Sequence, residues 1–209
     1  MKAFIYTGGT IFPDGITDHP KGEDITIAAD SGVKNAALLG VTPAFAVGDF
    51  DSFPETEIPR ETEITAVPAE KDFTDTQFAV DLALSHEATE IVIVGGLGGR
   101  LDHTLSNLGI LEKLYRMGVR AIFTDGNNRV RYIESTSELI PRSHYRYLSI
   151  LAVTDKVKGV SVEGGKYPLK NAKLSRINQF AVSNEIEKNC ALISVKKGGI
   201  FIIESRDPK

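Results

Sequence analysis

The chain has 209 residues, 42% of them hydrophobic and 25% charged, a balance typical of a globular protein with one large or two small domains. The formal net charge of −4 argues against a general nucleic-acid-binding protein, although a local basic pocket for phosphates is compatible with it. Cys190 is the only cysteine, so no internal disulfide can form, and no stretch is long and apolar enough for a signal peptide or a bilayer span. We therefore expect a cytoplasmic protein with no nucleic-acid or membrane partner.

The first two thirds of the chain alternate between strand and helix patterns. Helices are predicted at 31–39, 75–87 and 101–117, and glycines at 40 and 118 end the first and third of them. Such alternation predicts a mostly parallel sheet covered by helices. The strands are predicted at residues 2–7, 24–29, 44–48, 63–67, 90–95 and 120–124. The third helix is expected to bury Leu101, Leu105, Leu108 and Leu111 or Leu114.

The pattern changes near residue 128, after which short strands and turns follow one another. Glycine pairs at 164–165 and 198–199 mark two of the turns. Regularly spaced short strands predict a small β-sandwich, with the domain boundary within 135–145. We thus expect an α/β catalytic domain at 1–135 and a β-sandwich at 136–209. Beyond residue 128, strands are predicted at 129–134, 146–153, 157–162, 191–196 and 200–204.

Four polar segments stand at the edges between predicted strands and helices. In an open α/β sheet, ligands bind outside the carboxyl ends of the strands, and parallel strands bring these ends to one edge. The segments should therefore lie close together. They are Ala28-Ala29-Asp30-Ser31-Gly32, Gly48-Asp49-Phe50-Asp51-Ser52, Lys71-Asp72-Phe73-Thr74-Asp75 and Gly95-Gly96-Leu97-Gly98-Gly99-Arg100-Leu101-Asp102-His103.

The carboxylates among these segments suggest a metal site. Asp49 and Asp51 are two residues apart, so an extended backbone points both to the same side, where their charges repel. A bound Mg²⁺ would relieve that repulsion because it prefers carboxylate and phosphate oxygens, and Asp30 and Asp75 could complete the cluster. The plainer alternative is that each aspartate caps a helix or shapes a turn.

The remaining two segments have their own local explanations. Thr74 and Gln77 fit a capping box at the start of a helix, which does not prevent Asp75 from facing a metal. The glycine-rich segment follows a buried strand and opens a helix, so its N–H groups could approach phosphate while Arg100 clamps phosphate oxygens. It matches neither the P-loop nor the dinucleotide pattern, and on its own it predicts little. His103 is more typical of a surface residue than of a catalyst.

In their order and spacing, the four segments resemble the motif set of the thiamine pyrophosphokinase family over most of residues 24–135. The resemblance implies an α/β catalytic domain, a C-terminal β-sandwich and a homodimer. It also implies Mg²⁺ and the substrates ATP and thiamine, with thiamine diphosphate and AMP as products.

The resemblance also implies roles for individual residues. Animal members place a tryptophan against thiamine, and because this chain has none, Phe201 is one candidate to replace it. The resemblance assigns metal binding to Asp49, Asp51 and Asp75, and catalysis to Asp75, Asp102 and Arg100. It assigns ATP binding to Asp30, Ser31, Gly32, Lys71, Thr74, Gly98, Gly99 and Arg100, and thiamine binding to Ser183 and Asn184.

Two other functions remain open from the residues alone. Another Mg²⁺-dependent phosphoryl or nucleotidyl transferase would use the same acids and glycines. A non-catalytic nucleotide-binding module would explain the glycine-rich loop. It would not explain so many acids beside a phosphate site, because without metal they repel phosphate.

Overall fold

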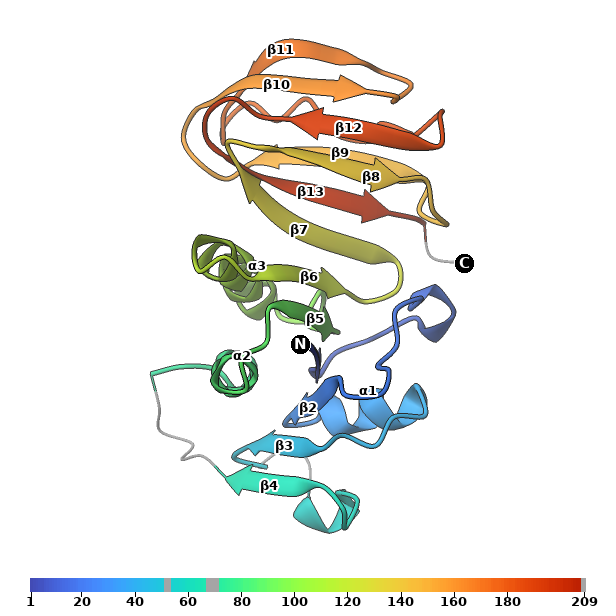
Figure 1. Ribbon diagram of the computed structural model, residues 1–209, viewed down its shortest axis with the longest axis vertical. Coiled ribbons are helices and arrows are strands. Elements are labelled where there is room, and N and C mark those ends of the chain that lie inside the picture. The colour runs from blue at the N-terminus through green and yellow to red at the C-terminus, as the bar shows by residue number, and fades with distance from the viewer. Residues whose placement is uncertain (51–53, 67–71, 208–209) are drawn as a thin grey trace. The chain divides into compact units, whose positions relative to one another are not determined.

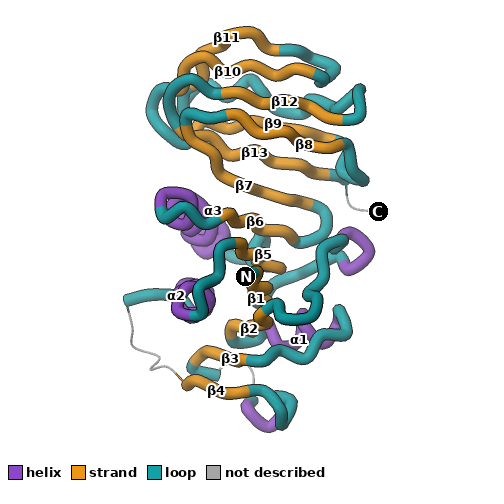
Figure 2. Tube along the Cα trace, in the orientation of Figure 1, coloured by secondary structure: helices purple, strands orange, loops and turns teal. Residues whose placement is uncertain are grey.

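The computed structural model describes residues 1–50, 54–66 and 72–207, which fold as two compact units, Met1–Gly126 and Asn127–Lys209 (Figure 1). The N-terminal unit is α/β and the C-terminal unit is entirely β, so the predicted fold class is confirmed (Figure 2). The strand Asn128–Glu134 belongs to the C-terminal unit, whereas the predicted division had placed it in the first domain. The assignment of the two functions to residues 1–135 and 136–209 stays a prediction.

The N-terminal unit is built on six parallel strands in the order β4-β3-β2-β1-β5-β6. The strands β1 and β5 are almost completely buried, because helices cover both faces of the sheet. Strands that are covered on both faces typically consist of continuous apolar runs. The strands are β1 (Lys2–Tyr6), β2 (Ile25–Ala29), β3 (Phe45–Gly48), β4 (Glu63–Ala66), β5 (Glu90–Val94) and β6 (Arg120–Thr124).

Three α-helices cover this sheet, with α2 and α3 on one face and α1 on the other (Figure 1). Gly40 and Gly118 follow α1 and α3 with positive φ angles of 70° and 77°, as predicted for residues that end helices. The helices are α1 (Gly32–Leu38), α2 (Asp75–Ser85) and α3 (Leu101–Arg116), and two short 3₁₀ helices span Pro13–Gly15 and Glu55–Glu57.

The predicted buried face of α3 is wrong in its first half. Leu101 and Leu105 are 69% and 60% exposed, whereas Leu111 and Leu114 are buried as expected. The other buried positions are Asn107 and Ile110. The first turns of α3 lie at the open edge of the sheet, where polar packing replaces the apolar stripe. No described helix has the length and apolar character needed to cross a membrane.

The C-terminal unit contains two antiparallel sheets, one of order β7-β13-β9 and one of order β11-β10-β12-β8. Two of its strands, β8 and β11, were not predicted, and β8 occupies the segment expected to be the domain boundary. The strands are β7 (Asn128–Glu134), β8 (Ser137–Pro141), β9 (Tyr147–Ala152), β10 (Val157–Glu163), β11 (Leu169–Leu174), β12 (Cys190–Ser194) and β13 (Gly199–Ser205).

A buried ion-pair network joins β7 to β13 in the C-terminal unit. The carboxylate of Glu204, whose side chain is 2% exposed, accepts two hydrogen bonds from Arg129 at 2.5 and 2.7 Å. Arg131 donates to the same carboxylate at 2.7 Å and to the more exposed Glu138 at 2.7 Å. Two guanidinium groups therefore share one buried carboxylate.

Candidate active site

A pocket of about 330 Å³ lies at the carboxyl edge of the parallel sheet in the N-terminal unit. It brings together seven of the predicted site residues: Asp30, Ser31, Thr74, Asp75, Gly98, Gly99 and Arg100. Its lining also includes Ala29, Gly96 and His103 from the predicted segments, and several residues that sequence reasoning had missed: Thr7, Gly8, Gly9, Thr76 and Asn107.

The loop after β1 is the main part of the pocket that was not predicted. Thr7 continues the strand by donating its N–H to Val94 O at 2.9 Å, and Gly8 and Gly9 follow. The buried side chain of Asn35 on α1 donates from Nδ2 to the carbonyl oxygens of Thr7 and Gly9 at 2.7 and 3.0 Å. A glycine pair directly after an apolar strand was the signal in the sequence that could have identified this loop.

The loop after β5 is held in a similar way. Gly95 and Gly96 have positive φ angles of 95° and 70°, and a β-carbon at either would lie within 3 Å of a neighbouring atom. The buried Asn107 on α3 donates from Nδ2 to Gly96 O at 3.0 Å. Each glycine loop thus has carbonyl groups bound by an asparagine from a helix.

Some backbone N–H groups of these two loops have no acceptor, whereas those of Gly95 and Gly96 donate to Thr124 O and Gly8 O. Within the described part of the chain, no group accepts a hydrogen bond from the N–H of Gly8, Gly9, Gly98 or Gly99. Because all four glycines line the pocket, the pocket offers backbone donors of the kind that bind phosphate oxygens.

The acids after β2 and β3 stand on adjacent strands. Asp30 donates its N–H to Val47 O at 2.8 Å and adopts a left-handed conformation with φ of 45°. A β-carbon at Gly48 would lie 3.2 Å from the Asp30 Cα, so the strand ends approach each other closely. Asp49 comes directly after Gly48. The structure therefore places the backbones of Asp30 and Asp49 side by side at the sheet edge.

The start of α2 places Asp75 in the pocket. Thr74 is the N-cap of α2: its hydroxyl accepts from the N–H of Gln77 at 3.2 Å, and its own N–H donates to Gln77 Oε1 at 2.9 Å. The predicted capping box is therefore confirmed. It fixes the first turn of α2 and with it the position of Asp75, which also complements the positive end of the helix.

Arg100 and Asp102 form an exposed ion pair at the start of α3. Arg100 donates from Nη2 to Asp102 Oδ2 at 2.6 Å and from Nε to Oδ1 at 3.2 Å. The hydrogen bonds from Arg100 lower the pKa of the Asp102 carboxyl below its usual value and raise the pKa of Arg100. Arg100 lines the pocket, whereas Asp102 is outside its lining.

Three described residues of the predicted site, Gly32, Asp49 and Asp102, are not part of the pocket lining. Asp51 and Lys71 lie outside the described residues. Gly32 is buried rather than part of the pocket lining, and a β-carbon there would lie 2.0 Å from Tyr6 O. Its role in this structure is the close packing of α1 against the end of β1.

The donor set fits a magnesium ion bound together with phosphate. Within the described residues, no group of three His, Cys, Asp or Glu side chains could hold a metal by itself. Mg²⁺ typically binds one or two carboxylates together with substrate phosphates and water, rather than a complete protein cage. Asp30 and Asp75 in a pocket lined by backbone N–H groups match that requirement.

In the C-terminal unit, Asn184 is buried and its side-chain amide is engaged by the backbone. Its Oδ1 accepts from the N–H groups of Tyr167 and Glu185 at 2.9 Å each, and its Nδ2 donates to Tyr167 O at 2.7 Å. Ser183 is exposed, with a left-handed φ of 57°, and its N–H donates to Ser149 Oγ at 2.9 Å. Asn184 therefore fixes this segment, whereas Ser183 presents its hydroxyl to solvent.

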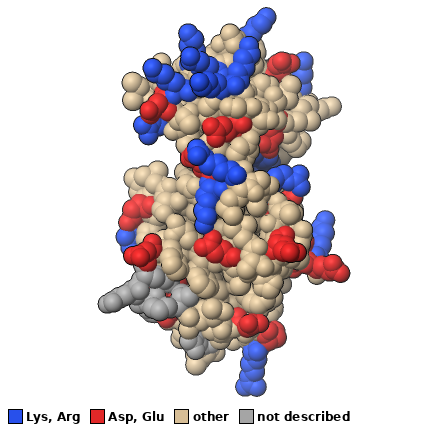
Figure 3. Space-filling view, turned by 60° about the vertical axis from the view of Figure 1, so that its left-hand side comes forward, with Lys and Arg blue, Asp and Glu red and all other residues tan. Residues whose placement is uncertain are grey.

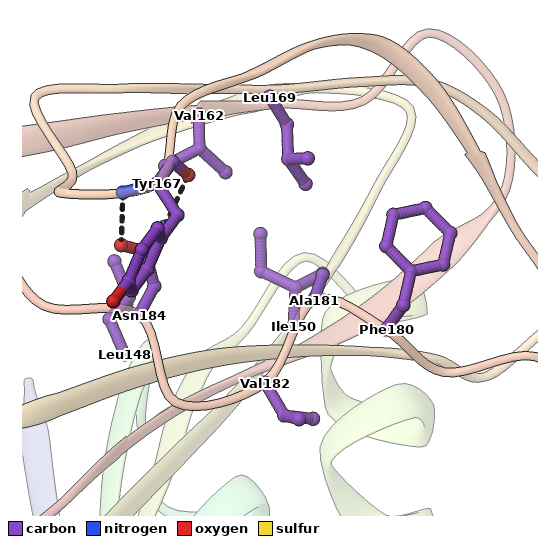
Figure 4. Close-up of a pocket in the computed structure, with 9 residues that line it drawn as sticks. All are labelled: Leu148, Ile150, Val162, Tyr167, Leu169, Phe180, Ala181, Val182 and Asn184. Atoms are coloured by element: carbon purple, nitrogen blue, oxygen red, sulfur yellow. Dashed lines mark hydrogen bonds between the residues drawn. The ribbon is translucent and has the colours of Figure 1, made fainter.

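Two further features of this unit involve aromatic side chains. Phe201 on β13 packs edge to face against Tyr132 on β7, with ring centroids 5.9 Å apart. Asn184 also lines an apolar pocket of about 220 Å³, which opens between Leu148, Ile150, Tyr167 and Phe180 (Figure 4). Its lining carries no ionisable carboxyl or amine group.

Comparison with known proteins assigns the two units. Residues 18–123 match the thiamin pyrophosphokinase catalytic domain, and residues 136–200 match the thiamin pyrophosphokinase vitamin B1 binding domain. The chain is 30% identical to thiamine pyrophosphokinase of Bacillus subtilis over 97% of its own length and 98% of that protein. It is 28% identical to thiamin pyrophosphokinase 1 of Caenorhabditis elegans over 78% of the chain and 70% of that protein.

Solved structures agree. The crystal structure of the Bacillus subtilis enzyme superposes with a TM-score of 0.89 at 28% identity, covering both chains completely. Thiamin pyrophosphokinase from Candida albicans shares the fold, with a TM-score of 0.80 at 18% identity over 98% of this chain and 89% of that one.

The two matched domains, one catalytic and one binding vitamin B1, are those of a diphosphate-transferring kinase. The chain belongs to the thiamine pyrophosphokinase family. Enzymes of this family transfer diphosphate from ATP to the hydroxyl of thiamine.

Proposed function

We propose that this chain makes thiamine diphosphate and AMP from thiamine and ATP, and that the phosphate chain of ATP binds in the pocket at the carboxyl edge of the parallel sheet. The observation that carries the location is the set of four glycine N–H groups with no acceptor in the described chain, next to Asp30 and Asp75. Lys71, Ser31 and Thr74 are proposed to contribute to the same binding site. Arg100 would hold phosphate oxygens at the rim.

The reaction requires alignment and charge neutralisation more than covalent catalysis. The oxygen of the thiamine hydroxyl forms a bond to the β-phosphorus, and the bond from that phosphorus to the α–β bridging oxygen breaks, releasing AMP. The hydroxyl proton passes to a carboxylate. Asp75 is the better acceptor, because it lines the pocket, whereas the lowered pKa of Asp102 makes that group a weaker base.

Asp49, Asp51 and Asp75 are proposed to hold Mg²⁺, which would neutralise charge on the transferred diphosphate and on the departing AMP. Asp30 stands next to this group on the adjacent strand. The binding of ATP then rests on the glycine N–H groups and Arg100 as well as on the metal, so removal of metal should weaken ATP binding without abolishing every contact.

The C-terminal unit is proposed to contribute to thiamine binding through Ser183 and Phe201. Asn184 acts as a positioning residue, because its amide is already bound to the backbone of Tyr167 and Glu185. We also propose that the active enzyme is a homodimer and that it works in the cytoplasm.

The experiment that tests this function follows the label from γ-labelled ATP in the presence of thiamine and Mg²⁺. The expected result is label in thiamine diphosphate, with one AMP formed for each product molecule and no ADP. ADP together with thiamine monophosphate would contradict attack at the β-phosphorus. ATP binding that is unchanged by EDTA, without turnover, would instead favour a non-catalytic nucleotide-binding module.

A further inference from the structure

Charge is divided very unevenly between the two units. The N-terminal unit has 9 Lys and Arg against 20 Asp and Glu, a net charge of −11, whereas the C-terminal unit has 15 against 8, a net charge of +7. The whole-chain charge of −4 conceals this division. An excess of one sign in one part of a chain points to an interaction of that part with the opposite charge.

Six exposed lysines of the C-terminal unit account for much of its positive charge, and a concentration of basic side chains is visible on this unit in Figure 3. They belong to the sheet β11-β10-β12-β8 and to the turns next to its strands, and we call them the basic face. No acidic side chain among the described residues forms an ion pair with them. The basic face consists of Lys156, Lys158, Lys170, Lys173, Lys196 and Lys197.

The lysines of the basic face are placed directly opposite one another. Lys158 on β10 is in register with Lys173 on β11, and on its other side it forms an isolated bridge with Lys197. Residues opposite each other in antiparallel strands point to the same side, where like charges are destabilising. Three adjacent positive charges across a sheet therefore cost stability in the free protein, and an anionic partner would remove that cost.

A bulge in β10 brings a fourth lysine to the row. Gly159 has a φ of 70°, and a β-carbon there would lie 2.5 Å from Lys196 Cγ. The aliphatic part of the Lys196 side chain therefore crosses β10 at Gly159, directly beside Lys158. A residue with a β-carbon at this position would leave no room for it. The glycine and the register together concentrate the charge.

A rigid turn with an exposed isoleucine lies at the same end of β10. Ile177 is 98% exposed in the turn that joins Ser175 to Asn178. The turn is tethered to the segment before β10, because Arg176 pairs with Asp155 and the side chain of Gln179 bonds the backbone N–H and C=O of Ala152 at 2.9 and 3.1 Å. A single exposed isoleucine is ordinary, but the residue before this one pairs with Asp155, which directly precedes Lys156 in the chain.

We propose that the basic face binds the surface of a bilayer containing anionic lipid, with Ile177 inserted at the level of the headgroups. Lysine clusters of this size bind anionic membranes, and an adjacent apolar side chain adds insertion to the electrostatic attraction. Single-stranded nucleic acid usually requires aromatic stacking platforms, and the basic face consists of lysine alone. Double-stranded nucleic acid is recognised by helices or narrow β-ribbons that enter a groove, and a broad sheet face does not enter one.

This inference revises the expectation that the protein has no membrane partner. That expectation rested on the lack of a spanning segment, which does not report on peripheral binding by one face of one unit.

The test is co-sedimentation of the full chain with vesicles of phosphatidylcholine alone and with vesicles that also contain phosphatidylglycerol. Binding is expected only to the anionic vesicles and should weaken as salt is raised. The triple variant Lys158→Glu, Lys173→Glu, Lys197→Glu should bind about a hundredfold more weakly. A matched triple variant, Lys21→Glu, Lys113→Glu, Lys188→Glu, has the same total charge and should bind as the unchanged protein does. Equal loss in both variants, or no binding to anionic vesicles at all, would overturn the proposal.

A second measurement separates a bilayer from other polyanions. The chain has no tryptophan, so Ile177→Trp introduces a single fluorescent reporter. Its emission should shift to shorter wavelength with phosphatidylglycerol vesicles, and should not shift with phosphatidylcholine vesicles or with a soluble polynucleotide. Tight binding to the polynucleotide, without a shift on anionic vesicles, would show that the basic face recognises nucleic acid and would overturn the bilayer assignment. Equal thiamine diphosphate production by both triple variants would establish that each is folded.

Discussion

The buried side chain of Asn35 donates to the carbonyl oxygen of Thr7 at 2.7 Å, so a residue of α1 holds the loop that leaves the central strand β1. Asn107 makes the corresponding bond from α3 to Gly96, in the loop after β5. Both bonds engage carbonyl groups, so they do not occupy the N–H groups of Gly8, Gly9, Gly98 and Gly99. Two residues outside the motifs that resemble the family therefore hold the loops of the proposed phosphate site.

Replacement of either asparagine should affect both stability and ATP binding. Asn35→Ala removes the donor to the buried carbonyl of Thr7, and Asn107→Ala removes the donor to the half-buried carbonyl of Gly96, each of which costs about 1–3 kcal/mol of unfolding free energy. The KM for ATP should rise severalfold more than the KM for thiamine. Denaturant unfolding and steady-state kinetics measure the two effects. Asn189→Ala, at an exposed position, should change stability by less than about 0.5 kcal/mol.

Removal of a carboxylate that is proposed to hold Mg²⁺ should separate activity from stability. Asp49→Asn and Asp75→Asn should lower turnover by at least about a hundredfold, because each removes charge that would hold the metal. The thermal melt of the free protein should change little or rise, since repulsion between carboxylates is relieved. The matched control is Asp81→Asn on the exposed side of α2, where Asp81 pairs with Lys113. Near-normal activity in both Asp49→Asn and Asp75→Asn would refute the metal assignment.

The ion pair of Arg100 and Asp102 predicts opposite effects for its two members. Arg100→Ala should raise the KM for ATP about tenfold or more, because a charged donor to phosphate is lost. Asp102→Asn weakens the competing bond to Arg100, so the KM for ATP should stay the same or fall. An increase of equal size in both variants would indicate that the pair acts as a unit.

The same pair makes a prediction about pH. Because Arg100 lowers the pKa of Asp102, the carboxylate stays charged, and the pair intact, as pH falls through the usual carboxyl range. The stabilisation from the pair is present at neutral pH and is lost only as pH falls through the lowered pKa. In Arg100→Ala, the pKa of Asp102 should rise toward its ordinary value. An NMR titration of the Asp102 carboxyl carbon measures both, and an identical pKa in the two proteins would contradict the pairing in solution.

In the C-terminal unit, Ser183 and Asn184 should respond differently to replacement. Asn184→Ala removes the bonds to the backbone of Tyr167 and should lower the melting temperature. Ser183→Ala should leave the melt unchanged and raise the KM for thiamine more than that for ATP. If Ser183→Ala has no effect on the KM for thiamine, the proposed contact of its hydroxyl with the substrate is wrong.

The alternating pattern of the first two thirds predicted all six strands and three helices of the N-terminal unit, because long apolar runs and helix-ending glycines are strong local signals. β11 escaped prediction because its sequence, Leu-Lys-Asn-Ala-Lys-Leu, alternates poorly and its strand is mostly exposed. The exposure of Leu101 and Leu105 at the start of α3 was not predicted, because local periodicity cannot show which turns of a helix pack against the sheet.

The motifs predicted which residues gather in the pocket, since parallel strands necessarily bring their carboxyl ends together. They did not predict the loop at Thr7, Gly8 and Gly9, which carries no charged residue. They also did not reveal that the side-chain amide of Asn184 is bound to the backbone of Tyr167, because hydrogen bonds between distant segments have no pattern in the sequence. Its partner Tyr167 is 17 residues away along the chain.

The position of β1 has a consequence for how the polypeptide emerges from the ribosome. β1 is synthesised before both of its partners: it pairs with β2 on one side and, from Lys2 to Tyr6, with Glu90 to Val94 on the other. One edge of this apolar strand therefore stays open until Val94 has left the exit tunnel, and such unpaired edges invite aggregation. Nascent chains that stop before β5 should consequently depend on chaperones, whereas chains that include β6 should already contain the complete parallel sheet.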